Sequence, residues 1–203
     1  MKLTIAIQKS GKLSQASRDY LNSLGFEFSW KEGDISASCL DQDIDILFLR
    51  DDDIPRYVVR GVADLGIVGQ NVLAEKKSRA VVIRLLDFGK CSLVIAVPKK
   101  SRLKRLDDLE GERVATSYPA VLSDFLKSRQ IRSAIIPIHG SVEVTVRTGL
   151  ADAICDLTQT GKTLQENNLK PLMTLFQSTA VLVRGPRLSD EKLQQIDSLF
   201  KPL

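Results

Sequence analysis

The segment Gly61-Val62-Ala63-Asp64-Leu65-Gly66-Ile67 decides the fold, because its pattern returns later in the chain as Gly149-Leu150-Ala151-Asp152-Ala153-Ile154. Each copy follows a helical pattern and leads into a short apolar run that is typical of a buried strand. In each copy the glycine can end the helix in the left-handed conformation, and the aspartate stands where the strand begins. We interpret the copies as equivalent points in two similar lobes. A chance repeat of so short a pattern is the alternative.

Apolar runs alternate with helical patterns on both sides of these segments. This alternation predicts an α/β fold with mainly parallel sheets. Two such lobes predict a cleft between them, with ligands at the strand ends. The expected strands are 3–7, 44–49, 64–68, 93–97, 113–116, 134–138, the residues around 154, and 180–183. The expected helices are 13–24, 54–60, 72–76, 121–130, 142–148, the stretch after 161, and 190–200. Residues 1–88 plus 176–203 are expected to form lobe one, and residues 89–175 lobe two, which carries the loop described below.

The composition favours a globular protein that acts on a small anion. The chain has 203 residues, of which 43% are hydrophobic, and a formal charge of +4. Its charges are interspersed and its aromatic residues are few, which argues against a nucleic-acid-binding tail or a base-stacking surface. The three cysteines are isolated and show neither disulfide nor metal spacing. We therefore expect buried free thiols and a cytoplasmic protein. The apolar run at the N-terminus is too short for a signal peptide, and we expect no membrane span because no stretch is long and apolar enough.

A turn rich in hydroxyls follows the second copy of the repeat. Asp156 stands at the expected strand end, and three threonines surround Gly161 and Lys162 before a helical pattern begins. Free backbone N–H groups and a helix start favour a phosphate there, while the carboxylate suits sugar hydroxyls or a metal-bound diphosphate. This pattern predicts a phosphorylated sugar as ligand, and an ordinary turn capped by Thr160 is the alternative. A P-loop is excluded, because the glycine that it requires is replaced by Asp156.

Three further strand ends carry polar groups. Residues 8–12 combine two lysines with a serine and a glycine, which indicates a second anion site or a solvated basic turn. Residues 50–53 place an arginine before three carboxylates, which could hydrogen-bond a nucleotide or complement a helix start, with a metal site as the weaker option. Ser141 can cap the helix that follows it, and Glu143 could stabilise that helix or bind a sugar hydroxyl or Mg²⁺.

Together these segments resemble the ATP phosphoribosyltransferase family, in order and over nearly the whole chain. The segments that carry the resemblance are 5–11, 49–55, 63–69, 86–89, 115–119, 140–144, 150–157 and 160–164. The resemblance implies a glycosyltransferase at the first step of histidine biosynthesis. In that reaction adenine N1 of ATP attacks the anomeric carbon of phosphoribosyl pyrophosphate, and pyrophosphate leaves with Mg²⁺.

The resemblance also implies roles for particular residues. Lys9 and Lys12 are expected to stabilise the charge of the leaving pyrophosphate. The residues expected to bind phosphoribosyl pyrophosphate are Asp152, Asp156, Thr158, Gln159, Thr160, Gly161, Lys162, Thr163, Leu164 and Glu143. The residues expected to bind ATP are Gln8, Ser10, Gly11, Arg50, Asp51 and Asp64. Metal ligands are not assigned. The family usually has arginine where Lys12 stands, and a basic residue near the position of Asp34.

The chain resembles either the short form of this family or the catalytic core of the long form without its regulatory domain. The implied partners are ATP and phosphoribosyl pyrophosphate, a second copy or more of the chain, and a separate regulatory subunit related to histidyl-tRNA synthetase. Neither nucleic acid nor a membrane is expected. The competing interpretation is a non-enzymatic two-lobe module that binds a small anion, as in periplasmic solute-binding proteins and the effector domains of transcription regulators.

Overall fold

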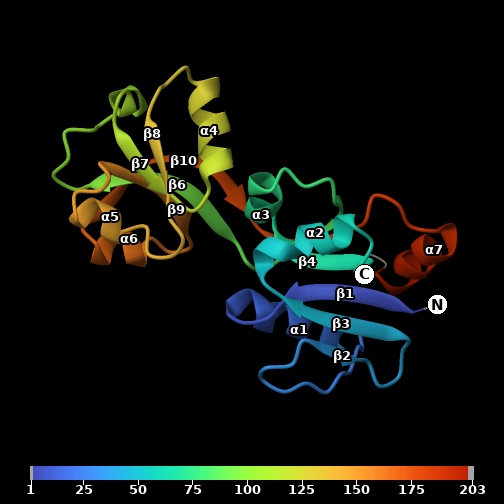
Figure 1. Ribbon diagram of the computed structural model, residues 1–203. Helices are drawn as coiled ribbons and strands as arrows, with labels where there is room; N and C mark the ends of the chain where they lie inside the picture. Colours follow the sequence, from blue (N-terminus) through green and yellow to red (C-terminus); the bar gives the residue numbers. More distant parts are fainter. Residues whose placement is uncertain (1, 201–203) are drawn as a thin grey trace. The chain divides into compact units, whose positions relative to one another are not determined.

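The computed structural model describes residues 2–200 and consists of two compact units (Figure 1). The first unit comprises the chain up to Gly89 and from Thr179 onward, and the second comprises Lys90–Ser178. The sequence pattern predicts two units with boundaries after residues 88 and 175, whereas the structure places them after Gly89 and Ser178. The second unit is therefore an insertion within the first, and each unit has its own sheet.

The first unit is built on a six-stranded sheet in the order β2-β3-β1-β4-β11-β5. Its parallel centre is formed by β1 (Leu3–Gln8), β3 (Ile44–Leu49) and β4 (Leu65–Gly69). Its antiparallel strands are β2 (Ser36–Ser38), β11 (Ala180–Arg184) and β5 (Val81–Leu85). The centre is almost continuously apolar because helices cover both of its faces.

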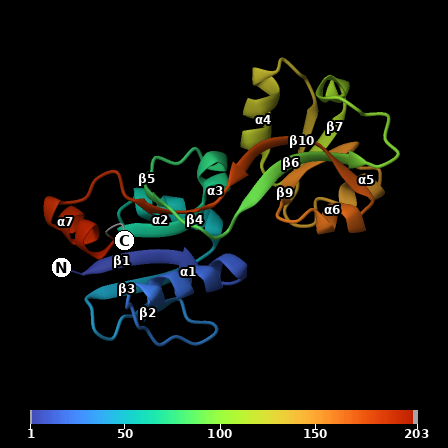
Figure 2. The same cartoon turned by 180° about the vertical axis from the view of Figure 1, so that it is seen from behind.

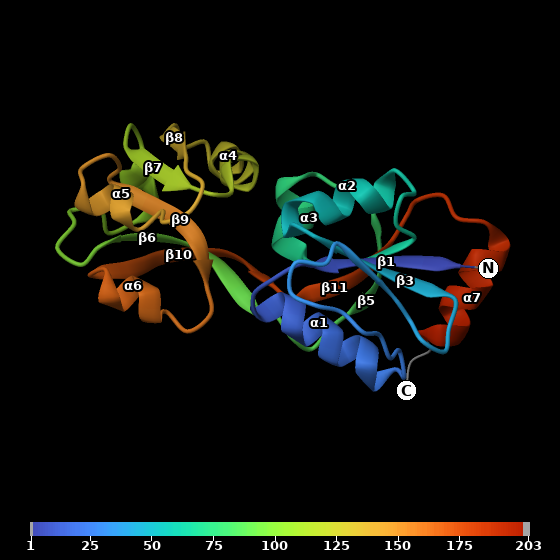
Figure 3. The same ribbon diagram turned by 60° about the horizontal axis from the view of Figure 1, so that its bottom comes forward.

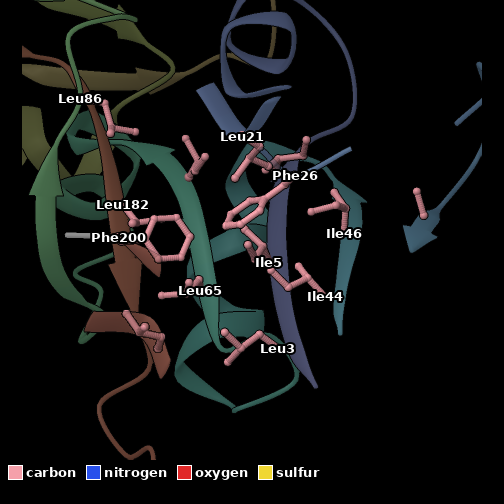
Figure 4. Packing of buried hydrophobic residues seen from close by; sticks show 14 of the residues in the cluster. Leu3, Ile5, Leu21, Phe26, Ile44, Ile46, Leu65, Leu86, Leu182 and Phe200 are labelled. Atoms are coloured by element: carbon pink, nitrogen blue, oxygen red, sulfur yellow. The ribbon is translucent and has the colours of Figure 1, made fainter. Parts of the chain in front are cut away.

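Within residues 2–200, four helices and one short 3₁₀ turn surround this sheet. The helices α1 (Lys12–Ser23) and α7 (Asp190–Leu199) pack on one face, where they form a core with Leu3, Ile5, Phe26 and Phe200 (Figure 4). The helices α2 (Ile54–Val59) and α3 (Gln70–Glu75) cover the other face, opposite α1 (Figure 3). The turn η1 (Asp51–Asp53) leads directly into α2.

The second unit repeats this plan on a five-stranded sheet in the order β10-β6-β9-β7-β8. Its parallel strands are β7 (Arg113–Thr116), β8 (Ala134–Pro137) and β9 (Ala153–Thr158). The long antiparallel strands β6 (Cys91–Pro98) and β10 (Leu169–Ser178) run side by side (Figure 2). The turn η2 (Leu106–Leu109) and α4 (Pro119–Ser128) cover one face, and α5 (Val144–Arg147) and α6 (Lys162–Glu166) cover the other.

The expectation of mainly parallel sheets needs correction, because both sheets are mixed. The sequence pattern missed β2, β5 and β10, and each of these strands pairs antiparallel to its neighbour. All three lie at a sheet edge, where burial does not impose a clear apolar pattern. In β10 the register also shifts next to Pro171, which an edge strand tolerates. Of the three cysteines only Cys155 is fully buried, whereas all three were expected to be.

The repeated aspartate has the same bonding in both units. Asp64 donates its N–H to the carbonyl of Thr4 (2.8 Å), and the N–H of Thr4 donates to Asp64 Oδ2 (2.9 Å). Asp152 and Arg113 form the same reciprocal pair at 2.9 and 3.0 Å. A cation completes each arrangement, namely Lys192 at 2.6 Å from Asp64 and the guanidinium of Arg113 at 2.9 Å from Asp152. The repeat is therefore structural, and it fastens the start of one parallel strand to the start of its neighbour.

Replacing Asp64 should destabilise the first unit. Asp64 is 4% exposed, so Asp64→Ala would leave the Thr4 amide and the Lys192 ammonium without their partner. We expect the free energy of unfolding to fall by about 2–4 kcal/mol, measured by urea denaturation. The control is Asp52→Ala, which removes an exposed pair with Lys76 and should cost at most about 1 kcal/mol. Equal losses in the two variants would contradict the role assigned to Asp64.

Candidate functional site

Two polar turns share the carboxyl edge of the parallel strands in the first unit. Residues 8–12 run from the last residue of β1 to the first residue of α1, and the backbone N–H of Lys9 donates to the carbonyl of Leu49 at the end of β3 (2.7 Å). Gly11 has a φ of 90° and precedes α1 without a side-chain cap, which leaves the helix start open to an anion. Lys9 and Lys12 are exposed beside it. The turn therefore concentrates positive charge at this edge of the sheet.

The carboxylates after β3 differ from one another. Arg50 is exposed at the end of the strand, and Asp51 begins η1. Burial is the main cause that raises the pKa of the Asp51 carboxyl, and the nearby charge of Asp52 raises it further. Asp52 instead forms an exposed ion pair with Lys76 at 2.8 Å. Of the three carboxyl groups in this run, Asp51 is the one that is half-buried. It lies near Lys9 because β1 and β3 are paired in parallel and end side by side at Gln8 and Leu49.

Two carboxyl groups come together in the second unit. Asp156 lies on β9, and Glu143 directly precedes α5 in the connection after β8. Burial is the main cause that raises the pKa of Asp156 to about 6, and the negative charge of Glu143 also raises it. The N–H of Leu157 donates to Asp156 Oδ1 at 2.8 Å, which acts in the opposite direction. A half-buried carboxyl beside a second carboxyl can accept hydrogen bonds from vicinal hydroxyls or share a cation.

The turn after β9 is closed by its own threonines. Gly161 adopts the left-handed conformation, with a φ of 75°, which turns the chain sharply into α6. The N–H of Gly161 donates to the Thr158 hydroxyl (3.0 Å), and the N–H of Lys162 donates more weakly to the Thr160 hydroxyl (3.4 Å). The helix that follows has five residues, so its dipole is smaller than the sequence led us to expect. Local amides and Lys162 must supply most of the attraction for an anion.

Three residues expected at the site lie away from these turns. Asp64 and Asp152 stand at the starts of β4 and β9, and therefore at the opposite edge of each sheet from the polar turns. Both carboxylates are occupied by the structural pairs described above. The Leu164 side chain is 6% exposed and packs in the apolar core under α6. A ligand role for these three side chains is not supported by their placement.

The structure also reveals groups that the sequence pattern did not single out. Arg18 is buried on α1, and its guanidinium lies 4.2 Å from the centre of the Trp30 ring. No signal in the sequence joins these two residues, because twelve positions separate them and Trp30 lies outside any regular element. Within residues 2–200 no three carboxylate, histidine or cysteine side chains gather as metal ligands would. None of the helices in that range is long and apolar enough to cross a membrane.

Comparison with known proteins identifies the family. Residues 50–203 match the family described as "HisG: ATP phosphoribosyltransferase". A protein of Cytophaga hutchinsonii named ATP phosphoribosyltransferase is 46% identical over 198 residues, which are 98% of this chain and 69% of that protein. The chain belongs to the ATP phosphoribosyltransferase family. This family membership makes it a transferase of the first step of histidine biosynthesis.

Solved structures place this ATP phosphoribosyltransferase family member in a wider fold group. The ATP phosphoribosyl transferase (HisG:HisZ) complex from Thermotoga maritima matches with a TM-score of 0.83 and 33% identity, covering 97% of this chain and 96% of the other. The periplasmic aliphatic sulphonate binding protein SsuA from Escherichia coli matches with a TM-score of 0.64 and 14% identity, covering 98% and 69%. The second likeness shows the fold alone. The expectation of a two-lobe, periplasmic-binding-protein-like α/β fold is confirmed.

The raised pKa of Asp156 leads to a prediction about pH. Below about pH 6 the carboxyl becomes neutral and loses its charge toward sugar hydroxyls or a metal. The affinity for phosphoribosyl pyrophosphate, measured by calorimetry between about pH 8 and about pH 5, should fall by up to about tenfold per pH unit below that pKa. In Asp156→Asn the affinity should be low throughout, and the part of the pH dependence due to Asp156 should vanish.

The stability of the same variant should change in the opposite direction. The folded-state pKa of Asp156 lies above its ordinary value of 3.8, so its charge opposes folding above about pH 6. Asp156→Asn should therefore be at least as stable as the parent protein at neutral pH in urea denaturation. A variant that loses both binding and stability would show that Asp156 is a structural residue.

Proposed function

We propose that the chain transfers the phosphoribosyl group of phosphoribosyl pyrophosphate to adenine N1 of ATP and releases pyrophosphate. The observation that carries this proposal is the pair Asp156 and Glu143 beside the turn at Gly161, in a chain 46% identical to a named ATP phosphoribosyltransferase. A carboxylate pair next to amides and a lysine suits a sugar that bears a phosphate. The carboxylates would bind the sugar hydroxyls, and the amides with the lysine would bind the phosphate of the same ligand.

In this proposal the second unit binds the sugar phosphate. Asp156 and Glu143 accept hydrogen bonds from the ribose hydroxyls. The 5′-phosphate takes over the amides of Gly161 and Lys162, which now donate to threonine hydroxyls. The displaced hydroxyls can then donate to the phosphate oxygens themselves. The residues proposed to line this phosphate site are Thr158, Gln159, Thr160, Gly161, Lys162 and Thr163.

The polar turns of the first unit are proposed to handle ATP and the leaving group. Gln8, Ser10 and Gly11 contact the nucleotide, with Arg50 and Asp51 from the neighbouring strand end. The N1 lone pair forms a bond to the anomeric carbon, while the bond from that carbon to pyrophosphate breaks and its electron pair leaves with pyrophosphate. Lys9 and Lys12 stabilise this developing charge, which is electrostatic rather than covalent catalysis.

Magnesium fits this chemistry as an ion that the substrate brings. Mg²⁺ keeps several waters and is commonly held by substrate phosphates with one or two carboxylates. Asp156 and Glu143 provide such carboxylates, and the described residues offer no cage of three or more ligands. When bound, the ion would neutralise the diphosphate and make it a better leaving group.

We also propose the setting in which the chain works. The named Thermotoga structure is a HisG:HisZ complex, which supports a separate regulatory subunit and an oligomeric assembly for this chain as well. The sequence resemblance relates that subunit to histidyl-tRNA synthetase and suggests at least a homodimer. We place the protein in the cytoplasm, in keeping with its free cysteines.

The direct test is pyrophosphate release from ATP and phosphoribosyl pyrophosphate in the presence of Mg²⁺. The isolated chain, or the chain with its regulatory subunit, should release one pyrophosphate for each phosphoribosyl group transferred. Omission of either substrate is the control. A protein that binds phosphoribosyl pyrophosphate but releases nothing, with or without the subunit, would support the alternative of a small-anion binding module.

Lys12 should act on the transition state more than on the bound substrates. Lys12→Ala should lower kcat by about tenfold to a hundredfold with little change in the dissociation constant of ATP, because it removes charge that matters as pyrophosphate leaves. Lys12→Arg is the matched control, since it keeps the charge and the family usually has arginine there; its kcat should stay near that of the parent. A loss of ATP affinity with kcat unchanged in Lys12→Ala would instead indicate simple ground-state binding.

A further inference from the structure

A cavity of about 440 Å³ lies entirely within the first unit, between the turn after β1 and the segment before β2. Lys9, Ser10 and Gly11 line one side, and residues 30–34 line the other. Arg18 and Phe48 also contribute to its wall. Its volume falls within the usual range for pockets that bind small molecules.

Arg18 is an unusual residue for such a wall. It is only 8% exposed, yet its guanidinium donates to two neutral oxygens, Ser14 Oγ (2.6 Å) and Gln15 Oε1 (2.9 Å). No carboxylate in the described part of the chain forms an ion pair with it. A buried charge without a counter-charge is costly, so its presence at a cavity wall points to a negatively charged ligand.

The other charges of the cavity add to this effect. Lys9 and Lys31 contribute two further cations, against the carboxylates of Glu32 and Asp34. Asp34 already accepts the backbone N–H of Lys31 at 2.6 Å. The adjoining start of α1 has no acidic residue in its first turn. The cavity is therefore net positive, and its most deeply buried charge is the guanidinium of Arg18.

Trp30 supplies an aromatic surface at the same place. Trp30 is the one tryptophan of the chain and is 38% exposed. The centre of its ring lies 4.2 Å from the guanidinium carbon of Arg18 and 5.8 Å from the centre of the Phe48 ring. These contacts fix the ring at the cavity wall. A large, fixed and partly exposed aromatic ring beside a cationic pocket suits a ligand that joins a flat base to phosphates.

We propose that this cavity holds the nucleotide substrate, with its phosphate chain against Arg18 and its purine ring against Trp30. The inference rests on the proposed function, which makes ATP the nucleotide. It adds Arg18 and Trp30, which no strand-end pattern indicates, as binding residues. Trp30 becomes the residue that contacts the base.

The first experiment uses Trp30 as its own reporter. Because Trp30 is the only tryptophan beside three tyrosines, fluorescence of the unmodified protein that is excited selectively from tryptophan reports on this ring. ATP should change the emission in a saturable way, tripolyphosphate should compete with ATP, and adenosine should bind more weakly than either. An emission that does not respond to ATP, at concentrations that saturate turnover or calorimetric binding, would overturn the proposal.

The second experiment separates the two halves of the ligand by calorimetry. Arg18→Gln should weaken both ATP and tripolyphosphate by about tenfold or more, and Arg18→Lys should lose less. Trp30→Leu should weaken ATP several-fold but leave tripolyphosphate unchanged, and Trp30→Phe should retain most of the ATP affinity. The matched control is Arg129→Gln, whose guanidinium also lies over an aromatic ring, Phe125, at 5.6 Å in the second unit. It should bind ATP normally.

Several outcomes would contradict the proposal, and each is separable from a failure of the proposed function. ATP affinity that is unchanged in both Arg18→Gln and Trp30→Leu, in variants with native circular dichroism, would exclude the cavity. Loss of ATP affinity in Arg18→Gln alone would leave an anion site without a base contact and overturn the assignment of Trp30. An unmodified protein that releases no pyrophosphate, with or without the regulatory subunit, would refute the transferase proposal, while its Trp30 response to ATP would still test the cavity.

Discussion

The structure depends on hydrogen bonds that join neighbouring parallel strands at their starts, which leaves the polar turns at the opposite ends available for ligands. In each unit an aspartate does this by exchanging two hydrogen bonds with one residue near the start of the neighbouring strand, Thr4 in β1 and Arg113 in β7. The carboxylate also holds a cation, which ties in α7 in the first unit and the strand β7 itself in the second. All polar turns proposed to bind substrates lie at the opposite edge, where no such fastening is needed.

The sequence was sufficient for those parts of the fold that are buried on both sides. Strands 44–49 and 113–116 were predicted with the bounds that the structure has, because each lies inside its sheet and its buried residues are mostly apolar. The edge strands β5 and β10 escaped prediction, since one side of each is solvated and the pairing is non-local. The repeated Gly-x-Ala-Asp pattern correctly marked two equivalent lobes. Its aspartates were expected to bind ligands, but the structure places them at the starts of β4 and β9, where each carboxylate is held in a structural pair.

The candidate site was predictable only where neighbouring residues share one turn. The segment from Thr158 to Lys162 forms a single local loop, as its composition suggested. The meeting of Asp156 with Glu143 depends on the adjacent order of β8, β7 and β9, which the chain order does not reveal. Arg18 is a similar case, because its significance comes from burial without a counter-charge rather than from its sequence neighbours. Electrostatic context of this kind is a property of the folded chain.

The strand order of the first unit sets a sequence of events for a chain that emerges from the ribosome. β11 lies between β4 and β5, yet it is made only after the whole inserted unit. Until residues 180–184 appear, β5 lacks its hydrogen-bonding neighbour and β4 has an open side. The inserted unit, whose strands are contiguous in the chain, can pair first. Once the inserted unit has folded, the pairing of Ser178 with Cys91 holds its two ends side by side, so completion of the first sheet awaits the synthesis of β11 rather than closure of a long flexible loop. A nascent chain that stalls before β11 is made would expose the unpaired edges of β4 and β5 to chaperones and to other nascent chains on the same mRNA.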